Sequence, residues 1–551
     1  MDRTSLGLEL NTYMFTLGSL GNLLPFGLIF LTSLILLNRL FTSLLLTLSV
    51  AAIIYFISFT KNNTLGKPLS GDDFIFLSYI DKSTISLFST YIDPLIGALA
   101  VTAAVIAFLL VGYFDKRFFH KSKTRVFLLL ALALVLSSTS LWIGKVYNFN
   151  TMRFSWSEQL STLHAGLISK IIFTEIKAQE AMKEPTNDND INHILSQFNS
   201  TTTPNIQSEG VKPDIIIIQS ESFFDPAIIA NAPETKGLLP NYYAALDEGR
   251  ASSMSVPTFG GGTIRTEYEL LTGIPMAAFP QIQFPYLQIR KDHFNSLATA
   301  AKSNGYTTTA IHGNSGSFWN RKSFFKKADF DKFLTSDDFP ITAKKDGYFL
   351  SDSSMTDVII DQLNNQNDKY KFIFAISIEG HGPYDTSPVF DPKLRDSIPS
   401  PMGLSKNAEL EYKNYLYHMH NADKELGRLT SFLNERGKPF ILVFYGDHLP
   451  GFTTVYNEVT FKNQLTAKDQ RVPVVIYSQG VRITTKPENS WSLGPSILKD
   501  AGLKVPRYFD VIANMGDQSA SKEDQSAFLS VARLQFSKGI EKYEYGVQSK
   551  K

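Results

Sequence analysis

The chain of 551 residues concentrates its long apolar runs before residue 146, and this asymmetry most constrains what it can fold into. A helix needs roughly 20 mostly apolar residues to cross a bilayer. Four runs of about that length, nearly free of charged side chains, cover residues 18–37, 41–59, 92–113 and 126–145. Four such runs do not suit the core of a soluble protein. We therefore predict a multi-helix transmembrane region over residues 1–145, with about four helices.

The loop at residues 114–125 (FDKRFFHKSKTR) carries five basic side chains between the third and fourth runs. Basic residues are enriched in the short cytoplasmic loops of membrane proteins. We therefore place this loop in the cytoplasm and everything after about residue 146 on the outer side of the membrane.

Composition excludes several classes of function. The net charge of +1, from 53 basic and 52 acidic residues, lacks the basic footprint of nucleic-acid binding, so no nucleic-acid partner is expected. The chain has no cysteine, which rules out disulfides, thiolate metal sites and a cysteine nucleophile.

Residues 146–211 are predicted to form a partly helical linker, and residues 212–520 to form a soluble domain. Short continuous apolar runs, such as Ile215–Ile218, are typical of strands buried on both faces. Strands are predicted at residues 214–222, 307–313, 371–380, 439–448 and 472–478, and helices at 240–249, 293–305, 355–366 and 410–437. This alternation indicates an α/β domain with a mostly parallel central sheet, followed by a C-terminal tail at 521–551.

Reactive side chains follow four of these strands: Glu221, His312, His381 and the pair Asp447 and His448. Ligands of parallel sheets bind beyond the carboxyl ends of the strands. Glu221, Asp447 and His448 offer two carboxylates and an imidazole, a set that suits Zn²⁺ or Mn²⁺. The alternative is an aspartate that caps the following turn, beside a locally bonded histidine.

The segment PTFGGGTIRTEYELLTG (257–273) places Thr263 directly after three glycines, at the start of a helical pattern. Glycines let the backbone approach a charged group closely, and a helix N-terminus favours phosphate. Thr263 is therefore a candidate nucleophile. In the alternative interpretation it is an ordinary helix N-cap, and the two roles are compatible.

The segment HGNSGSFWNR (312–321) gathers His312, Trp319 and Arg321 after a strand. Arg321 can hold phosphate oxygens in a bidentate way, and Trp319 can cover the polyol part of a ligand. The alternative is a packing tryptophan beside a solvated arginine. His381, in EGHGPYD, is placed to exchange protons with an entering or leaving oxygen.

Four segments follow one another along the chain: QSESFFD, GGTIRTEY, HGNSGSFWNR and YGDH. In this order they resemble the motifs of the lipoteichoic acid synthase-like phosphoglycerol transferases of the alkaline phosphatase and sulfatase superfamily. The resemblance covers about residues 213–515. It implies a metal site formed by Glu221 (QSESFFD), Thr263 (GGTIRTEY), Asp447 and His448 (YGDH), with Thr263 also as the nucleophile. It implies substrate contacts at His312, Trp319, Arg321 and His381, with His381 near the leaving oxygen.

From this resemblance we expect a multi-pass enzyme of the bacterial cytoplasmic membrane whose catalytic domain is extracytoplasmic. The expected cofactor is a divalent cation, Mn²⁺ before Mg²⁺ or Zn²⁺, which lowers the pKa of the Thr263 hydroxyl. The expected donor is phosphatidylglycerol, and the acceptor is an envelope glycan, a glycolipid or a polyglycerolphosphate chain. Two features depart from the family: Asn314 replaces a common aspartate, and four apolar runs stand in place of five helices.

Other functions stay open. A phosphoethanolamine transferase has the same nucleophile and anchor, although those enzymes usually carry disulfides. A hydrolase of phosphodiesters or sulfate esters would share the fold, but a sulfatase needs a Cys or Ser nucleophile in a CxPxR-like context, which GGTIR does not provide. The remaining alternative is a non-catalytic protein that binds envelope components.

Overall fold

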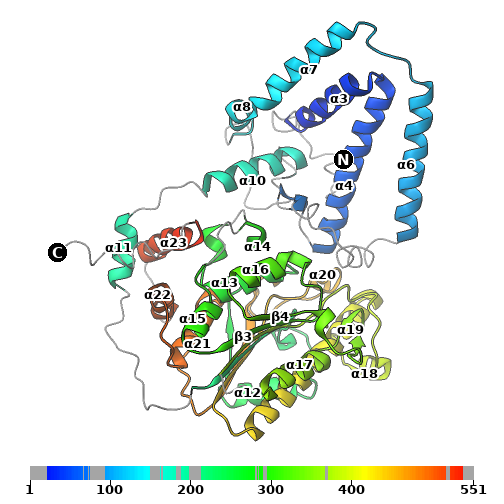
Figure 1. Cartoon of the computed structure of the whole chain (residues 1–551). Coiled ribbons are helices and arrows are strands. Elements are labelled where there is room, and N and C mark those ends of the chain that lie inside the picture. Colours follow the sequence, from blue (N-terminus) through cyan, green and yellow to red (C-terminus); the bar gives the residue numbers. More distant parts are fainter. Residues whose placement is uncertain are drawn as a thin grey trace, which may run out of the picture. The chain divides into compact units, whose positions relative to one another are not determined.

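The computed structural model (Figure 1) describes residues 21–65, 68–71, 73–74, 94–148, 162, 165–181, 188–197, 212–279, 282, 284–288, 294–365, 370–516 and 522–537. The chain forms two compact units, residues 1–183 and 184–551. The predicted linker contributes helix α10 (Leu167–Ala181) to the first unit and helix α11 (Asp188–Gln197) to the second. The finer domain boundaries stay predictions.

The first unit is built from apolar helices, blue to cyan in Figure 1. Two of them, α4 (Leu40–Leu65) and α6 (Pro94–Phe114), contain segments long and apolar enough to cross a membrane. Helix α3 (Leu23–Leu37) is apolar but has only 15 residues, fewer than the roughly 20 that a span needs. Where four spans were expected, the described residues therefore contain two helices of full length.

The fourth expected span is bent. Helix α7 (Ser122–Ser137) meets α8 (Thr139–Val146) at 66°. The hydroxyl of Ser138 donates to the carbonyl oxygen of Val135 at 3.0 Å, and side-chain bonds of this kind tend to bend helices. If the bent pair is one span, the count becomes three. The sidedness of the helices stays a prediction.

A seven-stranded sheet, in the order β2-β9-β8-β1-β7-β3-β4, forms the centre of the second unit. Its predicted strands are β1 (Asp214–Ser220), β3 (Thr307–His312), β7 (Lys371–Ile376), β8 (Phe440–Gly446) and β9 (Val472–Gln479). Two short edge strands, β2 (Ala251–Met254) and β4 (Lys332–Leu334), were not predicted. Among the described strands of this sheet, the antiparallel pairs are those that β9 makes with β8 and β2. The mostly parallel sheet is confirmed.

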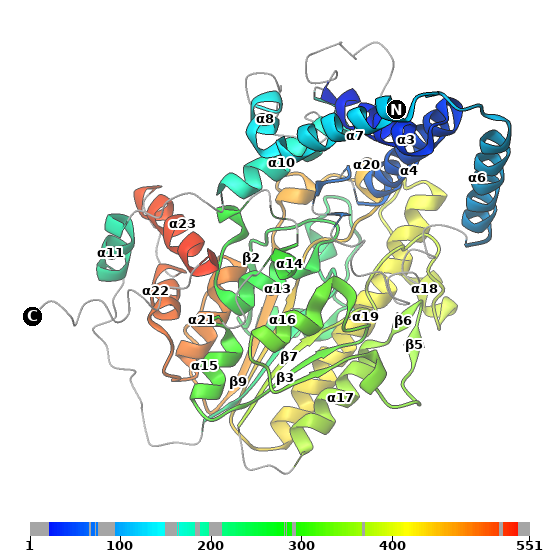
Figure 2. The same cartoon turned by 45° about the horizontal axis from the view of Figure 1, so that its top comes forward.

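Helices cover both faces of the sheet (Figures 1 and 2). One layer consists of α12 (Pro240–Asp247), α17 (Asp352–Asn364) and α19 (Lys406–Glu435). The other includes α13 (Thr263–Thr272), α15 (Leu297–Ser303), α16 (Arg321–Lys327) and α21 (Ser490–Asp500). The isoleucines of Ile215–Ile218 on β1 are at most 5% exposed, as expected for a central strand covered on both faces.

The C-terminal tail begins with a packed helix. Helix α23 (Lys522–Ser537) lies against α11, and Ile191, Ile194 and Val531 are fully buried. The Arg533 Nε–H also donates to the carbonyl oxygen of Ala278 at 3.3 Å. This part of the tail therefore belongs to the second unit.

Because β1 is buried, a cavity made in this strand should lower the free energy of unfolding. Ile217→Ala should lower the free energy of unfolding by about 2–5 kcal/mol, because Ile217 is 0% exposed. The matched control is Ile341→Ala: Ile341 is fully exposed, and its loss should cost less than about 0.5 kcal/mol. Denaturant unfolding of the purified full chain in detergent measures both, and equal losses would contradict the burial of β1.

Candidate active site

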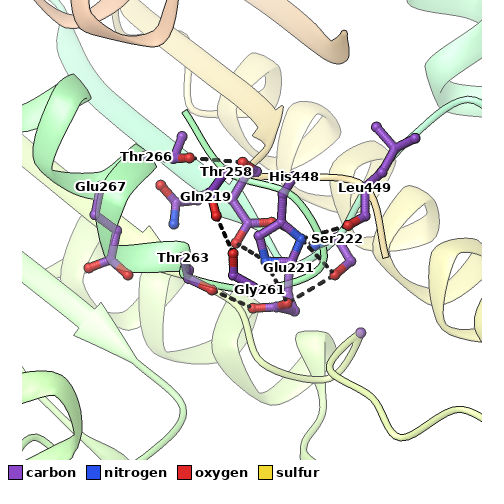
Figure 3. A network of polar contacts seen from close by, with 12 residues as sticks. Gln219, Glu221, Ser222, Thr258, Gly261, Thr263, Thr266, Glu267, His448 and Leu449 are labelled. Atoms are coloured by element: carbon purple, nitrogen blue, oxygen red, sulfur yellow. Dashed lines mark hydrogen bonds and ion pairs between the residues drawn. The ribbon is translucent and has the colours of Figure 1, made fainter. Parts of the chain in front are cut away.

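Two neighbouring strands bring the predicted metal ligands together. Strands β1 and β8 pair in parallel, with Ser220 opposite Gly446. The next residues, Glu221 after β1 and Asp447 and His448 after β8, therefore leave the sheet side by side. Figure 3 shows Glu221 and His448 converging in a network of polar contacts.

Glu221, Asp447 and His448 each offer one ligand atom, and these atoms all lie within 4.8 Å of one another. His448 Nε2 is 3.3 Å from Asp447 Oδ2 and 3.6 Å from Glu221 Oε1. All three residues are buried. Asp447 Oδ2 and His448 Nε2 have no hydrogen-bond partner within the described ranges, which is costly for buried polar atoms. This donor set fits a divalent cation.

Local bonds orient the ligands before any cation binds. His448 Nδ1 lies 2.9 Å from the carbonyl oxygen of Leu449; an N–H there donates to it and leaves the Nε2 lone pair free to coordinate. The backbone N–H of Ser222 donates to Asp447 Oδ1 at 2.7 Å, and the Ser222 hydroxyl donates to Glu221 Oε1 at 3.0 Å.

The charge balance of the site also favours a cation. Burial raises the pKa of Glu221 to about 8, with a further contribution from the carboxylate of Asp447 and opposition from His448. Two buried carboxylates repel each other unless a positive charge compensates them. A divalent cation between them would supply that charge.

Thr263 is the first residue of α13, and the residue that caps this helix is Gly262 (φ 81°). The N-cap alternative is therefore wrong. Instead, the Thr263 hydroxyl donates to Glu221 Oε2 at 3.4 Å (Figure 3). Gly262 is needed at the cap because a Cβ there would be strained and would lie 2.8 Å from Thr258 Oγ1. The candidate nucleophile thus lies beside a carboxylate of the candidate metal site.

The glycine loop is joined directly to the loop of the metal ligands. The N–H of Gly260 donates to the carbonyl oxygen of Leu449 at 3.1 Å. A Cβ on Gly260 would lie 3.3 Å from Gly451 Cα, so the two backbones pass in close contact. The Thr266 hydroxyl donates to the carbonyl oxygen of Asp447 at 2.9 Å. These bonds hold α13 in place relative to the ligands.

Arg321 is not solvated, contrary to the alternative interpretation: it is 2% exposed and forms a buried ion pair with Glu267. Arg321 Nε lies 3.2 and 3.1 Å from the two Glu267 oxygens, and Arg321 Nη1 lies 3.1 Å from His312 Nε2. Burial, with the charge of Arg321, holds the pKa of His312 well below its usual range. A neutral His312 accepts from Arg321 and donates from Nδ1 to the Ile376 carbonyl oxygen at 3.1 Å.

Trp319 lies half-buried after β3, with its ring centroid 4.8 Å from that of Phe284. Its backbone is left-handed (φ 57°), as is that of Asn320 (φ 60°). Consecutive non-glycine residues in this region are strained, and such strain clusters at functional sites.

His381 lies half-buried in the loop after β7. Its Nδ1 is 2.7 Å from the carbonyl oxygen of Gly382, so an N–H on Nδ1 leaves Nε2 for proton exchange. Burial lowers the pKa of His381; Arg321 acts in the same direction, whereas Asp447 opposes it. His381 therefore interacts electrostatically both with Arg321 and with Asp447 of the candidate metal site.

Sequence reasoning overlooked Glu267 as a partner of Arg321. Glu267 is 0% exposed and also accepts from the Tyr286 hydroxyl at 2.9 Å. The available signal was its spacing, four residues after Thr263, which places both side chains on one side of a helix.

The chain is similar to proteins of one superfamily. A family model described as Sulfatase matches residues 213–502. A Rhizobium meliloti protein named "Putative cyclic beta-1,2-glucan modification protein" is 33% identical over 321 residues, which are 56% of this chain and 48% of that protein. Lipoteichoic acid synthase 2 of Bacillus subtilis is 25% identical over 226 residues, or 39% of this chain and 33% of its own. The chain thus spans about half the length or less of these curated relatives.

Two solved structures share the fold. Phosphoglycerol transferase GacH of Streptococcus pyogenes, in complex with sn-glycerol-1-phosphate, has a TM-score of 0.52 at 20% identity, covering 67% of this chain and 95% of its own. Lipooligosaccharide phosphoethanolamine transferase A of Neisseria meningitidis, an integral membrane protein, has a TM-score of 0.50 at 12% identity, covering 83% and 85%.

The proposed ligand set predicts the metal content of variants. Asp447→Asn and His448→Gln should each weaken Mn²⁺ binding by at least about 10- to 100-fold. Loss of a residue that only hydrogen-bonds to a metal ligand already weakens metal binding by that much. Bound metal, measured by mass spectrometry after dialysis against limiting Mn²⁺, should fall accordingly. His420→Gln is the control, because His420 Nδ1 bonds the carbonyl oxygen of Leu238 instead. Unchanged metal content in either ligand variant would break the set.

The buried ion pair of Glu267 and Arg321 predicts that mutations of its two members have non-additive effects on the free energy of unfolding. Glu267→Gln should lower the free energy of unfolding by about 3–5 kcal/mol, because it leaves the Arg321 charge buried without compensation. Adding Arg321→Met to that variant should recover part of the loss. Denaturant unfolding of wild type, the two single variants and the double variant measures the coupling. Simply additive losses would mean that the two side chains do not act as a pair.

Proposed function

The chain belongs to the sulfatase family, and on that premise we propose that it is a membrane-anchored, metal-dependent transferase of glycerol phosphate. The donor is phosphatidylglycerol, and the acceptor is a hydroxyl of an envelope glycan, a glycolipid or a polyglycerolphosphate chain. The observation that carries this proposal is the position of Thr263: its buried hydroxyl lies 3.4 Å from a carboxylate of the candidate metal site.

Superfamily members use a divalent cation, and the donor set of Glu221, Asp447 and His448 fits one. When bound, such an ion lowers the pKa of a neighbouring hydroxyl and offsets negative charge. Mn²⁺ is our first choice, with Mg²⁺ and Zn²⁺ as alternatives, because carboxylate and imidazole ligands suit several of these ions.

In the first half-reaction, the Thr263 hydroxyl loses its proton to solvent, and Oγ1 forms a bond to the phosphorus of the donor. The bond between phosphorus and the diacylglycerol oxygen breaks, and that oxygen takes the Nε2 proton of His381, which enters this step as the doubly protonated imidazolium. Glycerol phosphate is then esterified to Thr263. In the second, an acceptor hydroxyl attacks the phosphorus and gives its proton to Nε2 of His381, the bond between phosphorus and Thr263 Oγ1 breaks, and Oγ1 takes a proton back from solvent.

Arg321 stabilises the charge on the phosphate oxygens. A guanidinium has five N–H bonds; here Nε and Nη2 each donate one to Glu267, and Nη1 donates one towards His312. Two N–H bonds remain for phosphate. Because Glu267 fixes the guanidinium in advance, little reorganisation is needed when negative charge develops.

The long apolar helices α4 and α6 suit a lipid donor. A donor that cannot leave the bilayer is met more often by an enzyme held at the same surface, since tethering raises the effective concentration. The catalytic unit is proposed to face the outer side, where the envelope acceptors are. The relative named for glucan modification supports a glycan among those acceptors.

Thr263→Ala should abolish diacylglycerol release from phosphatidylglycerol, a loss of at least about 10³-fold, because it removes the oxygen proposed to form the covalent bond. Thr263→Ser, which keeps the hydroxyl, should retain part of the activity. Release from a fluorescent donor by the purified protein, with and without Mn²⁺, measures this. Normal release by Thr263→Ala would remove Thr263 from the nucleophile role.

Mass analysis of the adduct on Thr263 distinguishes the competing functions. Glycerol phosphate on the residue supports the proposal, whereas phosphoethanolamine from phosphatidylethanolamine would assign the alternative donor. Release without any acceptor, at the full rate, would indicate a hydrolase. A folded, metal-loaded protein that forms no adduct with either lipid would be a binding protein.

A further inference from the structure

The buried carboxylate of Glu379 anchors the loop that joins β7 to His381. Glu379, two residues before His381, is 2% exposed and turns into the protein. Its Oε1 lies 3.0 Å from His418 Nδ1 and accepts from Asn421 Nδ2 at 2.7 Å. Its Oε2 accepts from the backbone N–H of Asp352 at 2.7 Å. Three donors from outside the loop therefore meet on this side chain.

These donors come from two helices of the same layer. Asp352 is the first residue of α17, and His418 and Asn421 lie three residues apart on α19, a spacing that places them on one side of the helix. His418 and Glu379 side chains are each 1% exposed. The carboxylate thus ties the loop to both helices out of reach of water, where such bonds are strong.

The front of the same loop lies against the candidate metal site. The Ser377 hydroxyl accepts from the backbone N–H of Glu221 at 2.9 Å. At Gly380 a Cβ would lie 2.6 Å from the Glu221 carbonyl oxygen, so the two backbones are in close contact. The Tyr384 hydroxyl donates to the carbonyl oxygen of Gly380 at 2.9 Å. A shift of the loop would therefore move His381 relative to the metal ligand.

We propose that Glu379 is a positioning residue for proton transfer: held by His418, Asn421 and the Asp352 N–H, it fixes the loop that places His381 beside the leaving oxygen. This inference rests on the proposed function, in which His381 Nε2 gives its proton to the departing diacylglycerol oxygen. Glu379 touches neither substrate nor metal, and it acts only through the position of His381.

Glu379→Gln keeps the size of the side chain but replaces one acceptor oxygen with an NH₂ donor. One of the three N–H donors then faces another donor, and the loop loses its fixed position. General acid catalysis contributes about 10²–10⁴-fold. We expect diacylglycerol release from phosphatidylglycerol to fall by about 10²-fold, mainly in kcat, with bound Mn²⁺ unchanged.

A second donor separates this role from simple structural damage. A glycerol phosphodiester of p-nitrophenol releases a stable phenolate, which needs no proton from His381, while it still requires Thr263 and the metal. Glu379→Gln should lower p-nitrophenol release less than about threefold, and His381→Gln should show the same contrast between the two donors.

Asp423→Asn is the matched control. Asp423 is a fully buried carboxylate on the same helix, α19, but it accepts from the backbone N–H groups of Asn241 and Tyr242 in α12. It should lower the rates on the two donors by the same factor, if it changes them at all.

The outcomes are distinct. Loss on the lipid donor alone, in both Glu379→Gln and His381→Gln, supports the inference. Equal loss on both donors in Glu379→Gln, or no loss on the lipid, overturns it while the proposed function stands. Failure of the proposed function itself shows differently, as no diacylglycerol release by wild type or by Asp423→Asn.

Discussion

The parallel pairing of β1 with β8 places Ser220 opposite Gly446, and the rest of the site depends on that register. Side chains alternate along a strand, so a slip of one residue would turn Glu221 away from Asp447. Gly446 makes the register possible, because a Cβ at that position would collide with the carbonyl oxygen of Phe223. Glu221 and Asp447, more than 200 positions apart in the chain, thereby become neighbours in the candidate metal site.

Sequence patterns were sufficient for this part of the structure. The continuous isoleucine run at 215–218 and the apolar run before Asp447 predict strands buried on both faces, and parallel strands end at the same edge of a sheet. Because all parallel strands end at the same edge, the candidate residues can be found without knowing which strands are neighbours. This rule therefore identified Glu221, His312, Asp447 and His448 as candidates, although their roles stay predictions.

The supporting side chains could not be identified in the same way. Glu267 pairs with Arg321 across 54 positions, and Glu379 pairs with His418 across 39; in the sequence each is an ordinary charged residue within a helix or loop. Only packing shows that they are buried and paired. The bend at Ser138 escaped for a related reason, because a window of apolar residues does not reveal hydroxyl groups that bond back to the helix backbone.

The two buried glutamates have parallel positions in the site. Glu267 lies one turn after Thr263 on α13 and holds Arg321, while Glu379 lies two residues before His381 and holds its loop. Neither is in the candidate metal set of Glu221, Asp447 and His448. The chain thus separates carboxylates that can bind a cation from carboxylates that position a side chain.

Burying each charge has a cost, which hydrogen bonds and ion pairs must offset. In return, Arg321 and His381, the groups proposed to meet the phosphate and the leaving oxygen, are already oriented before substrate binds, and such preorganisation is the main source of electrostatic catalysis.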